Sequence, residues 1–320
     1  MGSVITRGQF AAICVALFLI SGCSQDEKKT RIGYIQITQD EVLNTAKEGV
    51  FAALKDSGFI NGRNTRIFDN NAQGDLSMIA TIVQSLQSQG VELIITNSTP
   101  CMVGAAQLIS DIPVVFTVAF SPEQVGMKST PSNLYGIYDP LDAEKFVSMM
   151  LECLPTLKKV GFPYNNAEPN AEYSAKVFSG EFERRGIEIA KATVSSPNDL
   201  TMVGQYLAGQ DINAMIAAAD NTVYMGLNAL ARIADKSRIP LFVTDPHQAK
   251  KGAAIGLGVN YRRWGYLSGL KASEILKGHT IRDKIEPIAE TELLINPKAC
   301  KAQGLVVPQS IRKKATTIMQ

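Results

Sequence analysis

The sequence predicts an α/β protein of two Rossmann-like lobes, each with a parallel sheet, joined by a hinge of several crossovers. Strands alternate with helical segments along the chain, which is typical of right-handed βαβ units and parallel sheets. One strand–helix–strand unit occurs twice, about 120 residues apart. In addition, 320 residues exceed the usual size of a single hydrophobic core and suit two.

The repeated unit has the same order of apolar and polar residues in both copies. The first copy runs from residues 91–99 through a helical segment to residues 112–117, and the second runs from 212–220 to 239–244. In each copy an apolar strand ends in polar residues, and the returning strand begins with Ile-Pro and ends in Thr. Because ligands bind beyond the carboxyl ends of parallel strands, we expect the functional site at these four strand ends.

The remaining elements of the first lobe follow from apolar periodicity and from helix stop signals. Gly58 and Gly90 follow two of the expected helices, and glycine commonly ends a helix. Asp139-Pro140 follows the last strand, and we expect the chain to cross to the second lobe there. In order, we expect a strand at 31–37, a helix at 44–57, a strand at 63–68, a helix up to residue 89, the first repeat, and a strand at 134–138.

The second lobe is expected to begin after this crossover and to return at Asn260. Several crossovers, rather than one, would make a hinged pair of lobes. We expect the first lobe to comprise residues 31–138 with 261–284, and the second to comprise 139–260 with 285–320. In the second lobe we expect helices at 143–154, up to 185 and at 200–207, strands at 159–164, 187–194 and 253–257, and the second repeat. A helix at 262–276 follows in the first lobe, and the second lobe then ends with an extended segment at 287–295 and a short helix at 298–303.

Residues 1–22 are typical of a bacterial lipoprotein signal peptide. Arg7 precedes an apolar run at 10–20, which is too short to span a bilayer but suits the core of a signal peptide. The following Ile-Ser-Gly-Cys resembles a lipobox, where cleavage precedes a Cys that carries diacylglycerol. Cys23 is therefore the predicted lipidation site, and residues 23–30 are a polar tether. The alternative is an ordinary secretory signal with an incidental Cys.

The composition argues against catalytic, metal-binding and nucleic-acid-binding functions. A formal charge of +2 provides no basic surface for nucleic acid. The chain lacks a Gly-x-Ser-x-Gly elbow and a Walker loop, and its histidines are only His247 and His279. The spacing of Cys101, Cys153 and Cys300 matches no zinc site, and small buried hydrophobic residues or one disulfide are the alternatives for them. We therefore expect no enzyme activity, no cofactor and no metal.

Polar residues at the strand ends form a candidate binding site. Ser98 and Thr99 precede Pro100 at an expected helix start, where N–H groups and hydroxyls suit an anion such as a carboxylate. Asp220 and Asp245 lie at the matching ends of the second lobe and suit an ammonium group. Helix capping is the alternative role for Ser98, Thr99 and Asp220. Together these groups fit a zwitterion.

Two further features lie near the same strand ends. His247 follows Asp245 closely, and either a surface loop or a ligand contact would explain it. Some of the aromatic residues there would favour an apolar or aromatic ligand side chain if they reach the cleft mouth, although most belong in a core by frequency. These aromatic residues are Tyr34, Phe116, Phe120, Phe162, Tyr164 and Tyr224.

Several segments resemble the substrate-binding lipoproteins of ABC transporters, in the group that includes tryptophan-binding and other aromatic amino-acid-binding members. The resemblance covers essentially the whole chain after the signal peptide and implies the type I periplasmic binding protein fold. Pro163 inside a strand and Pro246-His247 after Asp245 depart from the family pattern on the expected cleft wall. The segments that match the pattern are Ile-Gln-Ile at 35–37, Asn-Ala-Gln-Gly-Asp at 71–75, Thr-Pro at 99–100, residues 112–117, Asp-Asn-Thr-Val at 220–223 and Ile-Leu-Lys-Gly at 275–278.

The resemblance also implies which residues line the cleft. In related amino-acid binders an acid near the position of Asp245 holds the ligand ammonium, and hydroxyls near Ser98 and Thr117 meet its carboxylate. The implied ligand-binding residues are Gln36, Gln73, Ser98, Thr99, Thr117, Asn165, Asp220, Asn221 and Asp245.

We therefore predict a monomeric, lipid-anchored, extracytoplasmic receptor that closes two lobes over a small solute. An amino acid, with aromatic ones among the candidates, is the first choice of ligand. Closure brings both lobes into contact with the ligand, and the differential affinity shifts the population toward the closed form. The receptor would deliver its solute to the permease and ATPase of an ABC importer. The alternative is a binding protein that senses the ligand and signals to a membrane partner.

Overall fold

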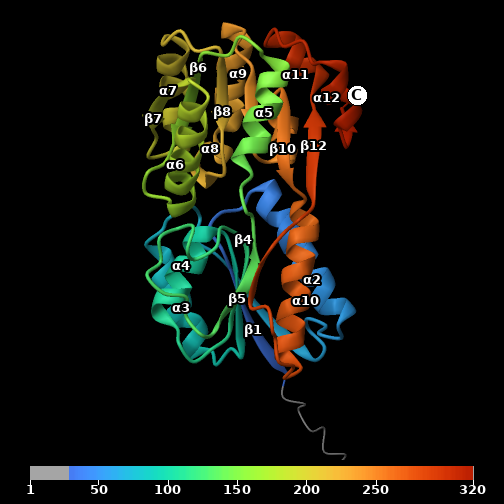
Figure 1. Cartoon of the computed structure of the whole chain (residues 1–320). Helices are drawn as coiled ribbons and strands as arrows, with labels where there is room; N and C mark the ends of the chain where they lie inside the picture. Colours follow the sequence, from blue (N-terminus) through green and yellow to red (C-terminus); the bar gives the residue numbers. More distant parts are fainter. Residues whose placement is uncertain (1–28, 320) are drawn as a thin grey trace, which may run out of the picture.

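The protein has two α/β lobes that lie end to end, each around its own sheet (Figure 1). The structure is a computed structural model that describes residues 29–319. The predicted signal peptide, Cys23 and most of the tether lie outside these residues. The predicted fold class is confirmed: both sheets are dominated by parallel strands that alternate with helices.

The first lobe is a six-stranded parallel sheet in the order β11-β5-β4-β3-β1-β2. Helices α2 and α10 cover one face of it, and α3 and α4 cover the other (Figure 1). Its strands are β1 (Thr30–Gln36), β2 (Thr65–Asn71), β3 (Leu93–Asn97), β4 (Val114–Ala119), β5 (Leu134–Tyr138) and β11 (Ile285–Pro287), and its helices are α2 (Glu41–Asp56), α3 (Met78–Ser88), α4 (Thr99–Leu108) and α10 (Tyr261–Leu276).

The second lobe is a seven-stranded sheet in the order β13-β12-β10-β9-β8-β6-β7, in which β12 runs antiparallel to β10. Its strands are β6 (Lys159–Tyr164), β7 (Glu188–Thr193), β8 (Ala214–Ala217), β9 (Leu241–Val243), β10 (Ile255–Val259), β12 (Thr291–Ile295) and β13 (Thr317–Ile318). Its helices are α5 (Ala143–Cys153), α6 (Pro169–Arg184), α7 (Leu200–Ala208), α8 (Asn221–Met225), α9 (Leu227–Ser237), α11 (Pro297–Ala302) and α12 (Gln309–Lys314), with 3₁₀ turns η1 (Pro197–Asp199) and η2 (Pro246–Lys251).

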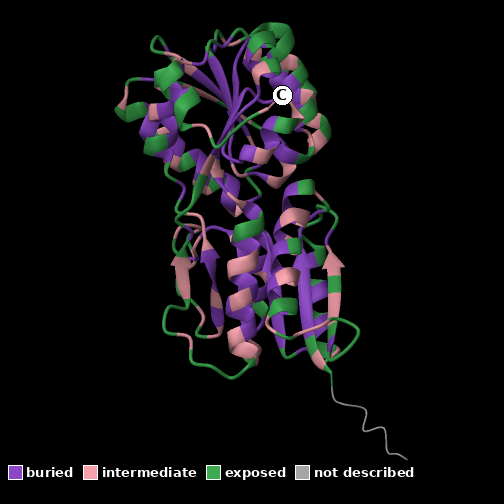
Figure 2. Cartoon of the chain, turned by 90° about the vertical axis from the view of Figure 1, so that its right-hand side faces the viewer, coloured by how far each residue is buried: buried purple, intermediate pink, exposed green. Residues whose placement is uncertain are grey.

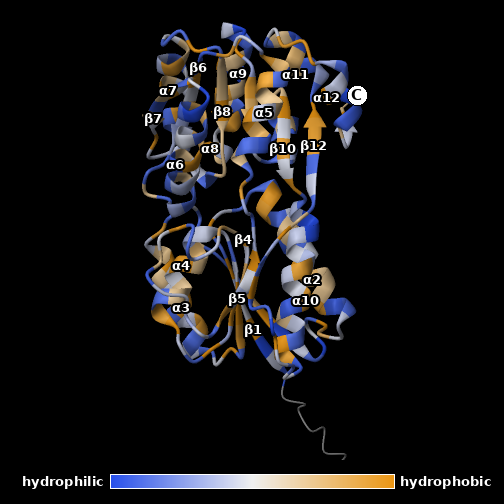
Figure 3. Cartoon of the chain, in the orientation of Figure 1, coloured by the Kyte–Doolittle hydropathy of each residue, from blue (hydrophilic) through white to orange (hydrophobic). Residues whose placement is uncertain are grey.

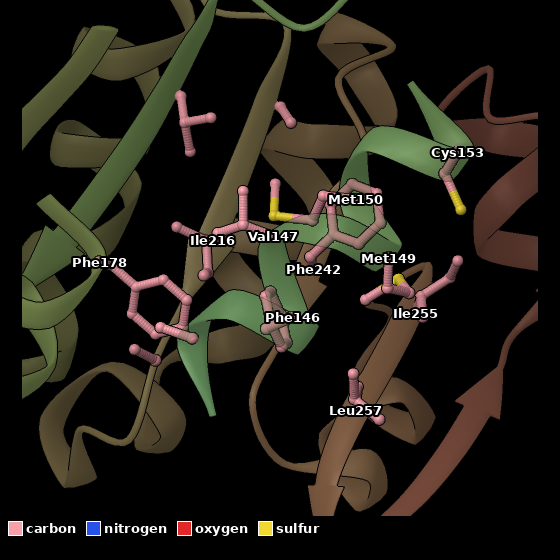
Figure 4. Close-up of a cluster of buried hydrophobic side chains, with 14 of the residues drawn as sticks. Phe146, Val147, Met149, Met150, Cys153, Phe178, Ile216, Phe242, Ile255 and Leu257 are labelled. Carbon is pink, nitrogen blue, oxygen red and sulfur yellow. The ribbon is translucent and has the colours of Figure 1, made fainter. Parts of the chain in front are cut away.

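Burial on both faces explains why the central strands are continuous apolar runs. All five residues of β3 and all four of β8 are buried, as expected for parallel strands covered by helices on both sides. Figure 2 shows the central strands as the buried centre of each lobe, and Figure 3 shows hydrophobic residues along several of these strands and along helices such as α3. In the second lobe, Phe146 and Met150 of α5 pack with Phe178 of α6 and Phe242 of β9 (Figure 4).

The chain crosses between the lobes three times. It leaves the first lobe after β5, returns to it between β10 and α10, and leaves it again between β11 and β12. The last boundary corrects an expectation, because residues 285–287 were assigned to the second lobe. Ile285 instead pairs with Gly136 at the edge of the first sheet. A strand of three residues is too short to produce a recognisable sequence period.

Helices α2 and α10 pack closely enough that glycine is required where they cross. A Cβ atom at Gly265 would lie 1.9 Å from the carbonyl oxygen of Ala46, and one at Gly49 would lie 2.1 Å from that of Arg262. Both distances are far below a van der Waals contact. The close approach fixes the start of α10, which faces the second lobe.

We predict that Gly265→Ala destabilises the protein by about 3 kcal/mol or more, because the added methyl group forces the two helices apart. Gly180→Ala in α6 is the matched control. No atom lies within 4 Å of its Cβ position, so the change should raise stability by roughly 0.5–1 kcal/mol through helix propensity. Urea denaturation of both variants measures the difference, and equal effects would contradict the close packing.

Candidate functional site

A cavity lies between the lobes at the carboxyl ends of both sheets. Its volume is about 50 Å³. The lining residues are Thr38, Asp40, Val42, Leu43, Thr99, Val118, Ala119, Phe120 and Asp139 from the first lobe and its crossover, Asn170, Ala219, Asp220, Asn221 and Tyr224 from the second lobe, and Tyr261 and Trp264 from α10.

The two lobes touch around this cavity, so the structure is a closed form. Lys251 of η2 pairs with Asp40 at the start of α2, with 2.6 Å between Nζ and Oδ2. Gln124, in the loop after β4, donates to the Tyr173 hydroxyl of α6 at 2.9 Å. Phe120 contacts the edge of the same Tyr173 ring, with 4.9 Å between ring centroids. These contacts join residues from opposite lobes and would break when the lobes open.

Several helices begin at the cavity, and α4 begins differently from its neighbours. Asp40, Asp220 and Asn260 cap α2, α8 and α10 by accepting backbone N–H groups of the first turn. Ser98 precedes α4 but makes no such bond, and its φ of 120° is rare for a residue with a side chain. The Ser98 hydroxyl is buried and has no partner within residues 29–319. The positive end of α4 is therefore left open at the cavity.

Other polar groups around the start of α4 also lack partners. The Thr117 hydroxyl and the Asn170 Oδ1 are buried, and neither has a hydrogen-bond partner in the described chain. Thr99 lines the cavity, and its hydroxyl accepts the N–H of Phe120 at 3.2 Å. Buried polar groups are normally paired, so unpaired ones beside a cavity indicate a place for a polar ligand group. An anion is the group that an open helix N-terminus prefers.

Three carboxylates line the cavity, whereas no Lys, Arg or His is among its lining residues. Asp40 accepts the N–H of Val42 and pairs with Lys251. Asp220 accepts the N–H of Asn165 at 2.6 Å through Oδ2 and that of Val223 at 2.9 Å through Oδ1. The third carboxylate is Asp139, at the crossover after β5, which was predicted as a crossover and not as a site residue.

Burial makes Asp139 and Asp220 weaker acids. It raises the pKa of Asp139 to about 6, and it raises the pKa of Asp220 well above the usual range, with a further contribution from the nearby Glu168 carboxylate. Glu168 is itself buried and accepts the N–H groups of Asn221 and Thr222 at the start of α8. A cation in the cavity would favour the ionised forms of these carboxylates.

The structure brings five of the nine predicted ligand residues to the cavity or directly behind it. Thr99, Asp220 and Asn221 line the cavity. Ser98 and Thr117 lie behind the start of α4, where the Ser98 N–H donates to the Thr117 carbonyl at 3.2 Å. These residues share the strand ends on which the prediction was based.

The other four predicted residues do not line the cavity. Gln36 is buried and donates to the Thr38 carbonyl and to Asn44. Gln73 lies in an exposed loop, and Asn165 holds Asp220 in place through its backbone N–H. Asp245 is fully buried at the start of η2, outside the cavity lining.

The site also contains residues that sequence reasoning did not assign to it. Tyr261 and Trp264 lie in the first turn of α10, and Asp40 caps α2. The expected return crossover at Asn260 was the available signal, since it placed the start of α10 between the lobes. Burial raises the pKa of the Cys101 thiol to about 12, so this residue is not a thiolate nucleophile at neutral pH.

Asp245 is a buried carboxyl group that forms no ion pair within residues 29–319. Its Oδ1 accepts the N–H of His247 at 2.9 Å, and its Oδ2 has no partner within the described residues. Burial raises its pKa to about 7, with a smaller contribution from Asp40. The folded form therefore binds a proton between about pH 4 and pH 7 that the unfolded form releases, so this group lowers stability as the pH rises through that window.

We predict that Asp245→Asn stabilises the protein relative to wild type at pH 8 and changes little at pH 4. The amide keeps the cap acceptor and removes the cost of ionising a buried carboxyl, which has an upper limit of about 4 kcal/mol. Thermal unfolding of both proteins at the two pH values measures this. A difference that is the same at both pH values would contradict the assignment of a raised pKa.

Comparison with known proteins agrees with this architecture. A family model described as ABC transporter substrate binding protein matches residues 31–319. A tyrosine-binding protein of Clostridioides difficile (strain R20291) is 26% identical over 303 residues, which cover 89% of this chain and 88% of the relative.

Within residues 29–319, no group of three or more His, Cys, Asp or Glu could hold a metal ion, and no helix has the length and hydropathy needed to cross a membrane.

Solved structures give the same result for the fold. A conserved domain protein from Vibrio cholerae has a TM-score of 0.86 at 24% identity, covering 91% of this chain and 100% of that one. An ABC domain from Streptococcus pneumonia in complex with L-Trp has a TM-score of 0.84 at 22% identity, with the same coverage. A ligand-free, open substrate-binding protein from Clostridium difficile has a TM-score of 0.67 at 25% identity, covering 91% and 99%. With its two lobes, its interlobe cavity and a family match along nearly the whole described chain, this protein belongs to the ABC transporter substrate-binding proteins.

Proposed function

We propose that this protein is the extracytoplasmic receptor of an ABC importer and that it binds an α-amino acid, with an aromatic side chain preferred. The observation that carries the proposal is the opposition of charge preferences across one cavity. The open N-terminus of α4 favours an anion, and the carboxylates favour a cation. An α-amino acid carries both charges, on two groups bonded to the same carbon atom.

The carboxylate end of the ligand would lie at the start of α4. Thr99, the first residue of α4, and Asn170 of α6 are within the cavity wall. The unpaired Asn170 Oδ1 belongs to an amide whose Nδ2 donates to Glu168 and to the Ala219 carbonyl. This fixes the amide in place, and its free oxygen can accept a hydrogen bond from the ligand ammonium group but not from the carboxylate.

The side-chain end of the ligand would lie among aromatic residues. Phe120, Tyr224, Tyr261 and Trp264 line the cavity, which is the composition expected for an apolar or aromatic group. Two relatives support this choice: one is named a tyrosine-binding protein, and one structure is an L-Trp complex. The higher TM-score with that complex than with the open, ligand-free structure supports a closed, binding-competent arrangement here.

A lipid anchor on Cys23 would hold the receptor at the membrane. The tether of residues 23–30 leads into β1, which begins at the end of the first lobe that lies farthest from the second lobe (Figure 1). The anchor would therefore restrain the first lobe and leave the second lobe free to move during closure.

We predict that residues 24–320, stripped of bound ligand by partial unfolding and refolding, gain thermal stability with aromatic L-amino acids. A ligand at 100 times its dissociation constant adds roughly 2.7 kcal/mol, which is a shift of several degrees. A thermal-shift screen of amino acids, sugars, nucleobases and simple carboxylates measures this, and calorimetry confirms each hit. Binding of a sugar or nucleobase in place of every amino acid would refute the proposal.

We also predict that Cys23→Ala releases the protein from the membrane fraction of expressing cells, because the thiol that accepts the diacylglycerol is lost. Cys14→Ala, within the predicted signal peptide, is the matched control and should leave the protein in the membrane fraction. Fractionation followed by immunoblotting distinguishes the two. Membrane association that survives Cys23→Ala would identify Cys23 as incidental.

A further inference from the structure

We propose that Asp139 binds the ammonium group of the ligand and, through the same carboxylate, couples ligand binding to the crossover between the lobes. This inference rests on the proposed function, because it requires a ligand with an ammonium group. It assigns the cation-binding role to a residue other than Asp245 or Asp220, and it links that role to closure.

Asp139 is built into the first crossover. Its backbone N–H donates to the Ala119 carbonyl of β4 at 3.2 Å, which attaches the crossover to the first sheet. Its Oδ1 accepts the N–H of Leu141 at 2.8 Å. Leu141 has a φ of 51°, a left-handed conformation that is costly for a branched side chain. The Asp139 carboxylate therefore stabilises a strained turn through which the chain passes from one lobe to the other.

The second oxygen of Asp139, a residue that lines the cavity, is free to accept a hydrogen bond. No hydrogen bond from residues 29–319 reaches Asp139 Oδ2, and this atom is not among the fully enclosed unpaired atoms of that part of the chain. Asp220 uses both of its oxygens on backbone N–H groups, and Asp40 uses one on Val42 and the other on Lys251. Of the three cavity carboxylates, Asp139 alone has an oxygen without a partner in the described structure.

The surroundings of Asp139 suit an ammonium group. Trp264 lines the same cavity, and its Nε1 donates to the Ile137 carbonyl at 2.7 Å, two residues before Asp139. Tyr261 packs on Trp264 with 5.6 Å between ring centroids, and the Tyr224 ring is also part of the cavity wall. Aromatic faces attract cations, most strongly where water is excluded. The ligand ammonium would thus lie against the Asp139 carboxylate oxygen at the edge of the aromatic cluster, and the rings themselves would contact the ligand side chain.

The charges of the residues that line the cavity also favour a bound cation at Asp139. No cationic side chain lines the cavity, and the nearby Lys251 already pairs with Asp40. Burial disfavours the ionised form of Asp139, and a bound cation restores it. Asp139 then holds the ligand with one oxygen and the crossover turn with the other. Because both bonds form on one rigid group, binding favours the crossover geometry of the closed form.

The test compares Asp139→Asn with Asp142→Asn, using L-tryptophan and its deaminated analogue indole-3-propionate as probes. Asp142 is exposed, caps α5 and does not line the cavity, so its amide variant is the matched control. We expect Asp139→Asn to weaken L-tryptophan binding by about 100-fold or more, since the buried ammonium loses its charged partner. Binding of indole-3-propionate should change little, and Asp142→Asn should behave as wild type with both probes.

Calorimetry gives the affinities, and circular dichroism with thermal unfolding checks that each variant is folded. Asp139→Ser, which keeps a hydroxyl acceptor for the Leu141 N–H but no charge, replaces Asp139→Asn if the amide variant does not fold. Equal losses for both probes, or L-tryptophan binding that survives the loss of charge, would overturn the role of Asp139 alone. A wild-type protein that binds no amino acid in the screen would overturn the proposed function, and this inference with it.

Discussion

The close contact between α2 and α10 is the constraint on which the binding cavity depends. These helices lie far apart in the sequence, and α10 is reached only after the chain has built most of the second lobe. Their approach through Gly49 and Gly265 fixes where both helices begin. Asp40 caps one start, and Tyr261 and Trp264 occupy the other, so one wall of the cavity is positioned by backbone contact rather than by the side chains that line it.

The lobes could be predicted from the sequence because their strands are apolar runs with a repeated pattern. Burial on both faces of a parallel sheet demands such runs, and the polar residues that end them mark the carboxyl ends. This reasoning identified Thr99, Asp220 and Asn221, which line the cavity. It misplaced β11, since three residues at a sheet edge need no distinctive pattern to add a parallel strand.

The residues that would bind a cation were harder to predict, because they depend on whether a carboxylate is buried in the protein or faces the cavity, and position after a strand does not decide that. Asp245 follows a strand just as Asp220 does, yet Asp245 turns into the protein and caps η2, while Asp220 faces the cavity. The side chains of Asp139, Tyr261 and Trp264 come from crossovers and from a helix start. The predicted crossovers place these segments between the lobes, but which of their residues face the cleft is decided by how the two lobes meet.

The electrostatics of the cavity connect closure with ligand chemistry. In the closed form the half-buried carboxyl of Asp139 has no cationic side chain in the cavity lining to pair with, and the N-terminus of α4 has no capping side chain. Both conditions cost free energy, because a buried charge or dipole without a partner loses its hydration. Opening the lobes would relieve the cost with water, and a zwitterion of matching length would relieve it while the lobes stay closed. A ligand that lacks either charge would leave one of the two costs in place, so the closed form itself selects for ligands that carry both.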